Sequence, residues 1–277
     1  MAFRVHFVRI IRELADELGL EIEAYSNDWA FRLRKDGRTR YVVGYHFPLN
    51  CSSAKELCQD KSLTYDALKS ASVPAVPHIF IPGRNAGGNG KLEQYRPLLE
   101  SLIRESGYAV VKDNYGTGGN RVYRYKDADE AIAKIAELHE IVNGACVSPW
   151  QEIREEYRVT MLEGEPLLVI RKERRSKTLA DGTKEYVEWR HNLGLGAKAI
   201  VVTDPEILGI VEEIAKRAAA AMDISFASVD VIETEEGFRV LEVNAGVMME
   251  HFAGQSEETY ETAKSIYRKA LLRCFED

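Results

Sequence analysis

The chain has 277 residues, of which 45% are apolar and 29% are charged, an ordinary composition for a globular protein with a substantial core. Its 44 acidic residues outnumber 37 basic ones, and the net charge of −7 argues against bulk electrostatic binding to nucleic acid or to an anionic membrane. No stretch approaches the roughly 18 uninterrupted apolar residues of a membrane-spanning helix, which excludes that class of protein.

The N-terminal segment predicts a helix and three strands. Apolar residues within 7–18 repeat at the spacing of one helix face, and frequent charges argue against a signal peptide. Strand-like runs follow at 22–26, 30–35 and 40–47, separated by polar turns.

A helix and an irregular stretch come next. Ser53 and Glu56 fit a capping box, so we expect a helix that begins there and ends before Pro74. The glycine-rich run at 82–91 is either a linker or a mobile loop.

The rest of the chain mixes hairpins with helices. A strand, a glycine loop and a second strand precede a helix that begins after Asp127, its predicted N-cap. Asp204 and Pro205 open another helix in the same way. The remaining predictions are hairpins at 155–173, turning at Glu163-Gly164, and at 227–244, and a last helix at about 256–273. Strands and helices do not alternate strictly, so we expect an α+β fold.

The four cysteines show neither a CxxC pair nor the spacing of a metal site. They are Cys51, Cys58, Cys146 and Cys274. We therefore expect reduced thiols and a cytoplasmic protein.

The hairpin at 227–244 predicts a metal site. If it turns at 234–237, Asp230 lies opposite Glu242, and Asn244 lies one pleat further along. Opposed carboxylates repel unless a cation joins them, and oxygen-only ligands suit Mg²⁺ or Mn²⁺ better than zinc. Strict alternation places Val240 on the same side as Glu242. The residues then expected on the buried face are Val229, Val231, Leu241 and Val243. The alternative is a solvated outer face.

A glycine-rich loop follows the strand at 108–111. Lys112 ends this strand, and Gly116, Gly118 and Gly119 leave backbone N–H groups free to turn toward phosphate oxygens. The loop is neither a P-loop nor a dinucleotide fingerprint, because no GK[ST] follows and the next element is a strand. A plain hairpin turn is the alternative.

Two further segments carry polar groups in loops. Gln151, Glu152 and Ile153, with Glu156 close behind, offer backbone edges to a base and a carboxylate to ribose, although a charged start to a strand explains them equally well. The stretch 189–199 combines Arg190, His191 and Asn192 with two glycines, which is typical of a loop over an anionic site or of an ordinary surface loop.

Taken in order from Lys61, these motifs resemble the ATP-grasp superfamily, and within it the carboxylate–amine ligases similar to ribosomal-protein glutamate ligase, glutathione synthetase and cyanophycin synthetase. The resemblance runs from about Ser53 to His251, and its most specific parts are VKDNYGTGG and EVN with the upstream Asp230. It implies an ATP-grasp fold, in which two α+β subdomains grip ATP. The implied divisions are a short N-terminal α/β region at 1–60, a central subdomain with the glycine-rich lid loop at 61–150, and a C-terminal subdomain with the metal site at 151–277.

The resemblance also implies roles. Lys61 and Lys112 would hold phosphates under a lid of Gly116, Gly118 and Gly119; Gln151, Glu152 and Ile153 would contact adenine, and Glu156 would contact ribose. Asp230, Glu242 and Asn244 would hold two Mg²⁺ ions, for which Mn²⁺ could substitute. Arg158, Arg171, Arg190 and Asn192 would surround the γ-phosphate and the substrate carboxylate, with His191 at the border.

Two departures from the family pattern concern the substrate side. Only about 60 residues precede Lys61, so this side is either unusually open or completed by a partner subunit. The motif continues as EVNAGVMMEHF and lacks the usual Pro-Gly, so Met248, Met249 and His251 either line a different acceptor pocket or serve packing.

The implied reaction is ATP-dependent formation of an amide or peptide bond through an acylphosphate, with release of ADP and phosphate. The expected partners are small-molecule or peptide substrates, and family analogy indicates a homodimer or higher homo-oligomer. The alternatives are an ATP-grasp kinase and a non-catalytic nucleotide-binding protein. ATP turnover separates them, since a ligase needs two co-substrates, a kinase one and a binding protein none.

Overall fold

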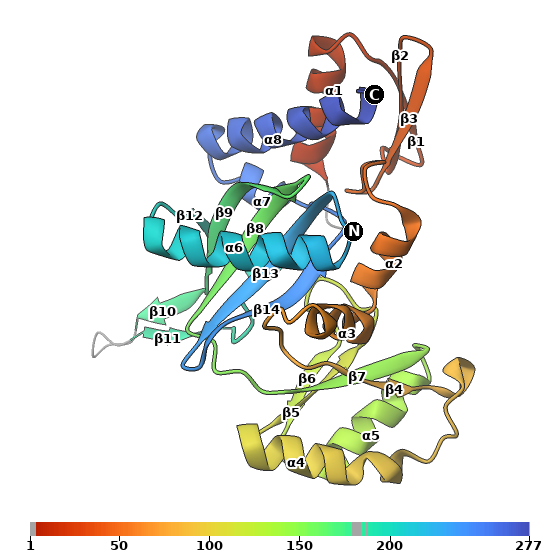
Figure 1. Cartoon of the computed structure of the whole chain (residues 1–277), viewed down its shortest axis with the longest axis vertical. Helices are drawn as coiled ribbons and strands as arrows, with labels where there is room; N and C mark the ends of the chain where they lie inside the picture. Colours follow the sequence, from red (N-terminus) through yellow and green to blue (C-terminus); the bar gives the residue numbers. More distant parts are fainter. Residues whose placement is uncertain (1–3, 179–183, 187, 277) are drawn as a thin grey trace.

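The computed structural model describes residues 4–178, 184–186 and 188–276. Figure 1 shows three stacked parts, with the two ends of the described chain in the upper half. Each part contains a sheet and at least one helix. The three sheets have three, five and four strands, and there is a separate two-stranded ribbon.

The beginning and the end of the chain share one core at the top of Figure 1. Its elements are α1 (Val5–Glu17), β1 (Glu21–Tyr25), β2 (Ala30–Lys35), β3 (Arg38–Val43), α7 (Glu250–Ala253) and α8 (Glu257–Phe275). Phe7 lies in its centre, and the rings of Phe47 and Tyr267 stack 5.6 Å apart. The predicted first helix, three strands and last helix are confirmed, whereas the packing of α8 against α1 was not expected from the sequence.

A buried carboxylate joins these two ends. The Glu250 carboxylate accepts hydrogen bonds from the backbone N–H groups of His6 at 2.8 Å and Phe7 at 2.9 Å. These are orphan donors of the first turn of α1, so the carboxylate both satisfies them and meets the positive end of the helix dipole.

The middle part is an antiparallel sheet with α6 (Pro205–Ala221) on one face (Figure 1). Its order is β12 (Lys198–Val201), β9 (Glu165–Glu173), β8 (Glu155–Leu162), β13 (Phe226–Thr234) and β14 (Gly237–Asn244). Val159, Val229 and Val231 are fully buried in the same core as residues of α6. Because side chains alternate along a strand, Glu156, Arg158 and Asp230 point from the opposite face. Both predicted hairpins and the helix capped by Asp204 are confirmed.

A β-bulge corrects part of the predicted pattern. Asp230 does pair with Glu242, but the register then shifts, and Val231 pairs with Val240. Leu241 is therefore the extra residue of the bulge. The prediction that Val240 shares the face of Glu242 and that Leu241 is buried beside Val243 was wrong: Val240 is 1% exposed in the core, and Leu241 lines a cavity.

The lower part is a four-stranded sheet covered by two helices. Its elements are β4 (Ile79–Pro82), β7 (Gly144–Pro149), β5 (Ala109–Asp113), β6 (Val122–Tyr125), α4 (Arg96–Ser106) and α5 (Ala128–His139). Asp127 caps α5 as predicted. The sequence did not predict α4, and 82–91 is the connection between β4 and the segment that leads to it, with a 3₁₀ turn at Arg84–Ala86.

The helix predicted from Ser53 consists of two helices. α2 (Ser52–Gln59) begins after Cys51, whose sulfur accepts from the Ala54 N–H, and α3 (Lys61–Ser70) begins after Asp60, whose carboxylate accepts from the Leu63 N–H. A capping residue in the middle of a helical pattern ends one helix and starts the next. Lys61 is therefore the first residue of α3.

No helix in the described part of the chain is long and apolar enough to cross a membrane. All four cysteines are free thiols.

We expect Glu250→Ala to lower the free energy of unfolding by about 2 kcal/mol, because it leaves two helix N–H groups buried without acceptors. Urea unfolding measures this, with Glu213→Ala on the exposed side of α6 as the control. Equal stability of the two variants would contradict the capping role.

Candidate active site

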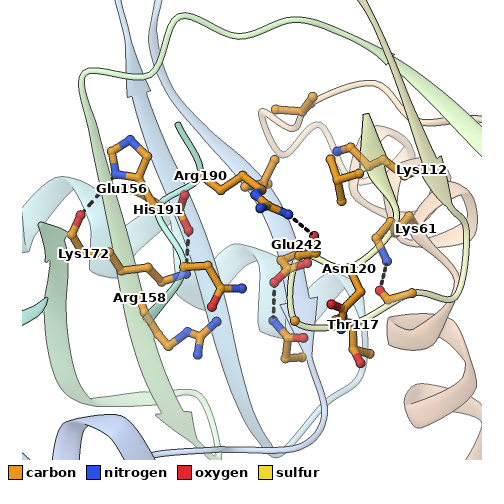
Figure 2. Close-up of a pocket in the computed structure, with 18 of the residues that line it drawn as sticks. Lys61, Lys112, Thr117, Asn120, Glu156, Arg158, Lys172, Arg190, His191 and Glu242 are labelled. Carbon is orange, nitrogen blue, oxygen red and sulfur yellow. Dashed lines mark hydrogen bonds and ion pairs between the residues drawn. The ribbon is translucent and has the colours of Figure 1, made fainter. Parts of the chain in front are cut away.

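A cavity of about 740 Å³ lies where the three parts meet. Figure 2 shows two lysines on one side of it, charged side chains of the five-stranded sheet on the other, and Glu242 between them. Most of the predicted site residues line it. They are Lys61, Lys112, Gly116, Gly118, Gly119, Gln151, Glu152, Ile153, Glu156, Arg158, Arg190, Asn192, Glu242 and Asn244.

The segment between β7 and β8 forms one wall and connects the two larger sheets. The Trp150 indole lies 5.7 Å from the Tyr108 ring and 5.3 Å from the Trp189 ring. The Arg124 guanidinium lies over all three rings, at 4.7 to 5.3 Å from their centroids. Trp189 belongs to the loop before β12, whereas Arg124 belongs to β6 (Val122–Tyr125). These cation–π contacts therefore join the two sides of the cavity. No sequence pattern predicted this cluster.

The two lysines occupy fixed positions. The Lys61 ammonium donates to the Gly116 carbonyl of the glycine loop. The Lys112 ammonium lies 2.8 Å from His78 Nε2, and His78 Nδ1 lies 3.0 Å from the Val76 carbonyl. An ammonium can only donate, so His78 donates from Nδ1 and accepts at Nε2 as a neutral ring.

Burial sets the charge state of this pair. Burial, with Lys112 nearby, holds the pKa of His78 well below its usual value, which keeps the ring neutral. Burial also lowers the pKa of Lys112, and Lys61 adds to the effect. His78 was not predicted, because a lone histidine in a loop has no distinguishing pattern.

The glycine loop meets the loop before β12. Gly118 and Gly119 have φ of 68° and 70°, which favours glycine. Arg190 Nη1 donates to the Gly119 carbonyl at 2.7 Å, and the Glu188 carboxylate holds the same guanidinium at 2.8 and 2.9 Å. Hydrogen bonding from Arg190 lowers the pKa of Glu188 to about 2. A Cβ on Gly119 would lie 3.1 Å from Asn192 Nδ2, so glycine permits the close approach.

The floor of the cavity is lined by Arg158, Lys172 and Glu156, with Asp230 beneath them. The Arg158 side chain is 16% exposed, whereas the other three residues are buried. Arg158 donates to both oxygens of Asp230 at 2.7 Å, and Lys172 donates to Asp230 at 2.8 Å and to Glu156 at 2.5 Å. Burial alone would raise the pKa of Asp230, but Arg158 and Lys172 outweigh it and hold that pKa well below its usual value. Burial raises the pKa of Glu156 to about 7, although Lys172 opposes the shift. Lys172 was missed because it lies in a charged run at the end of β9.

Glu242 and Asn244 have the oxygen donors that suit Mg²⁺. They line the cavity from β14, and Asn244 Nδ2 donates to Glu242 Oε1 at 3.1 Å. Among the described residues, no three His, Cys, Asp or Glu side chains group closely enough to hold a metal by themselves. Two or three oxygen ligands fit a magnesium ion that takes its other ligands from water and phosphate.

Two predicted residues do not line the cavity. Asp230 is 1% exposed beneath the floor, where Arg158 and Lys172 occupy its carboxylate. Arg171 lies opposite Tyr157 in the β8–β9 pairing, and its guanidinium donates to Glu155 at 2.8 Å.

The N-terminal part of the chain contributes Trp29, Tyr45 and His46 to the cavity lining. In the segment that follows the EVN motif, Met248 lines the cavity, whereas Met249 is 5% exposed in the core.

Residues 86–266 match the sequence model of the RimK-like ATP-grasp domain. The chain belongs to this family. It is similar to the tetrahydromethanopterin:alpha-L-glutamate ligase of Methanocaldococcus jannaschii, with 25% identity in an alignment of length 237 that covers 76% of each protein.

Solved structures share the ATP-grasp fold. The D-alanyl-alanine synthetase A of Vibrio cholerae O1 superposes with a TM-score of 0.65 at 13% identity, over 98% of this chain and 92% of that one. The D-alanine–D-alanine ligase of Bacillus anthracis in complex with ATP gives 0.60 at 18% identity, over 80% and 67% of the two chains. The predicted family and its α+β fold are confirmed.

We expect His78→Leu to weaken ATP binding about tenfold, because the partly buried Lys112 ammonium loses its acceptor. Titration with a non-hydrolysable ATP analogue measures the affinity. His78→Gln, which keeps an acceptor on a side chain of similar length, is expected to restore most of it. Equal affinity of the leucine variant and the unchanged protein would contradict this role of His78.

Glu156 makes stability depend on pH. Its pKa rises from 4.5 to about 7 on folding, so the unfolded chain releases this proton first as the pH rises. The contribution to stability is complete below about pH 4.5 and is lost as the pH passes about 7.

The free energy of unfolding should therefore decrease between about pH 5 and 8. We expect Glu156→Gln to make this decrease smaller by roughly 1–3 kcal/mol. Urea titrations at both pH values test this, with Glu155→Gln, on a half-exposed neighbour, as the matched control. An unchanged slope in the Glu156 variant would show that its pKa is not raised.

Proposed function

We propose that this chain is an ATP-dependent carboxylate–amine ligase that forms an amide or peptide bond on an amino acid or peptide. One observation carries the proposal: a single cavity combines the connecting segment, two lysines, a glycine loop, buried cations and the Glu242–Asn244 pair. The family match and the ligases among the similar proteins support it.

In the proposed reaction, a carboxylate oxygen attacks the γ-phosphorus of ATP, and the bond to the β,γ-bridging oxygen breaks, which releases ADP. An amine nitrogen then attacks the acyl carbon, the carbon–oxygen bond to phosphate breaks, and the nitrogen releases a proton. No protein nucleophile takes part, so the residues act by position and charge.

The nucleotide would lie with its base along Gln151–Ile153 and its phosphates between Lys61 and Lys112. Arg158 and Lys172 would place two cations on the facing sheet, where the γ-phosphoryl group would be transferred. We propose that the Glu156 carboxylate holds the Lys172 ammonium in position. A contact between Glu156 and the ribose stays a prediction. The glycine loop, held in place by the hydrogen bond from Arg190 to Gly119, would exclude water from the acylphosphate.

Glu242 and Asn244 would hold Mg²⁺, and Asp230, opposite Glu242, stays a predicted third ligand. When bound, the ion neutralises phosphate charge as a Lewis acid. Two ions, replacement by Mn²⁺, a cytoplasmic location and a homo-oligomer belong to the proposal. Arg190 and Asn192 would contact the substrate carboxylate. Arg171, outside the cavity, retains only a supporting role through its pairing with Glu155.

We expect phosphate release from Mg-ATP that requires two co-substrates, when pairwise mixtures of amino acids and dipeptides are tested. Glu242→Gln is expected to lower the rate by about 100-fold or more, because it removes a charged oxygen ligand. Glu236→Gln, on the exposed turn of the same hairpin, is the matched control.

Release with a single hydroxyl compound would favour the kinase, and a protein that binds ATP without turnover across the panel would favour the non-catalytic alternative.

A further inference from the structure

One end of the cavity is formed by residues outside the matched family domain. Trp29, Tyr45 and His46 line it from the N-terminal part, whereas the family match begins at residue 86. This end adjoins the metal-ligand strand, because a Cβ on Gly246 would lie 3.0 Å from the His46 ring. With the nucleotide base on the opposite wall, this end is left for the substrates.

Trp29 is half-exposed and yet fixed in place. Its side chain is 52% exposed, and the Arg4 guanidinium lies 4.7 Å from its ring centroid. Gly44 adopts a φ of +60°, and a Cβ there would lie 3.2 Å from Trp29 Cζ2. The Gly44 N–H also donates to the Trp29 carbonyl at 2.9 Å. Because Gly44 has no side chain, its backbone lies close to the Trp29 ring and holds that ring in place.

The turn before Trp29 is also specified. Ser26, Asn27 and Asp28 have φ of 52°, 53° and 61°, a left-handed run that non-glycine residues rarely adopt. Arg12 donates to the Asp28 carboxylate at 2.6 Å, and Arg4 donates to the Asp28 carbonyl. A tight turn, held by two arginines, thus presents a large apolar ring to the cavity without burying it, which forgoes the usual gain from burial.

The Arg4 guanidinium is a charged neighbour of the ring, but it is not one of the residues that line the cavity. The cavity-lining residues contributed by 29–46 and 246–248 are Trp29, Tyr45, His46, Gly246 and Met248. Burial lowers the pKa of His46, so its ring is neutral near pH 7. Arg4 is occupied by the Gly44 carbonyl at 2.5 Å and by the turn. These five lining residues offer no charged side chain, whereas the exposed part of the Trp29 ring would contact an aromatic ring or a hydrocarbon chain.

We propose that Trp29 is a specificity-determining residue that receives a planar ring or a hydrocarbon group of one of the two co-substrates. The preferred substrate therefore carries such a group beside its reacting carboxylate or amine. This assignment rests on the proposed function, since it takes the cavity to hold a ligase substrate next to ATP.

The test is calorimetric titration in the presence of Mg²⁺ and a non-hydrolysable ATP analogue, which fills the nucleotide end. The probes are matched pairs with and without a ring, namely phenylalanine against alanine and glutamyl-phenylalanine against glutamyl-alanine. We expect the ring-bearing member to bind more tightly. Trp29→Ala should weaken its binding about tenfold and leave the ring-free member and the ATP analogue unchanged.

Trp29→Phe, which keeps a ring face, is expected to retain most of the affinity and guards against a folding defect. Tyr41→Ala removes an aromatic side chain of similar exposure on the same small sheet, away from the cavity, and should change nothing. No ring preference in the unchanged protein, or an equal preference in Trp29→Ala, would overturn the assignment.

Phosphate release measured on the same pairs separates the two proposals. Release without a ring preference contradicts the role of Trp29 alone. A ring preference that depends on Trp29, without release for any pair, supports this binding role and contradicts the ligase.

Discussion

The pairing of Arg158 and Lys172 with Asp230 and Glu156 at the cavity floor is the interaction on which the site depends. Arg158 and Lys172 together neutralise Asp230, and Lys172 also holds Glu156. Removing one member of such a set leaves a buried charge without a partner, which costs about 3–5 kcal/mol. In the proposed reaction these two cations would therefore already be in position for the phosphate, without rearrangement at the moment of reaction.

This arrangement follows from strand register. Asp230 lies directly opposite Arg158 on one side of β8, and the pairing of Tyr157 with Arg171 on the other side brings Glu156 beside Lys172. The other faces of these strands pack against α6, so the core and the charged floor are two sides of one sheet. The contacts of Arg190 with Gly119 and of Arg124 with Trp189 then join this sheet to the opposite side of the cavity.

Local sequence patterns predicted much of this. The opposition of Asp230 and Glu242 follows from one short hairpin, and helix caps at Asp127 and Asp204 are signals within four residues. The bulge at Leu241 interrupts the alternation of side chains along β14, and no glycine or proline at that position predicts it. Lys172 and His78 were missed because their roles depend on partners 58 and 34 residues away. Such pairs are fixed only when the strands are assembled.

The most direct test of the central claim, that this cavity activates a carboxylate with ATP, is oxygen transfer. A carboxylate substrate labelled with ¹⁸O, incubated with ATP, Mg²⁺ and the amine, should deliver one labelled oxygen to the released phosphate, since the acylphosphate breaks at its carbon–oxygen bond. Turnover that releases unlabelled phosphate would contradict the account.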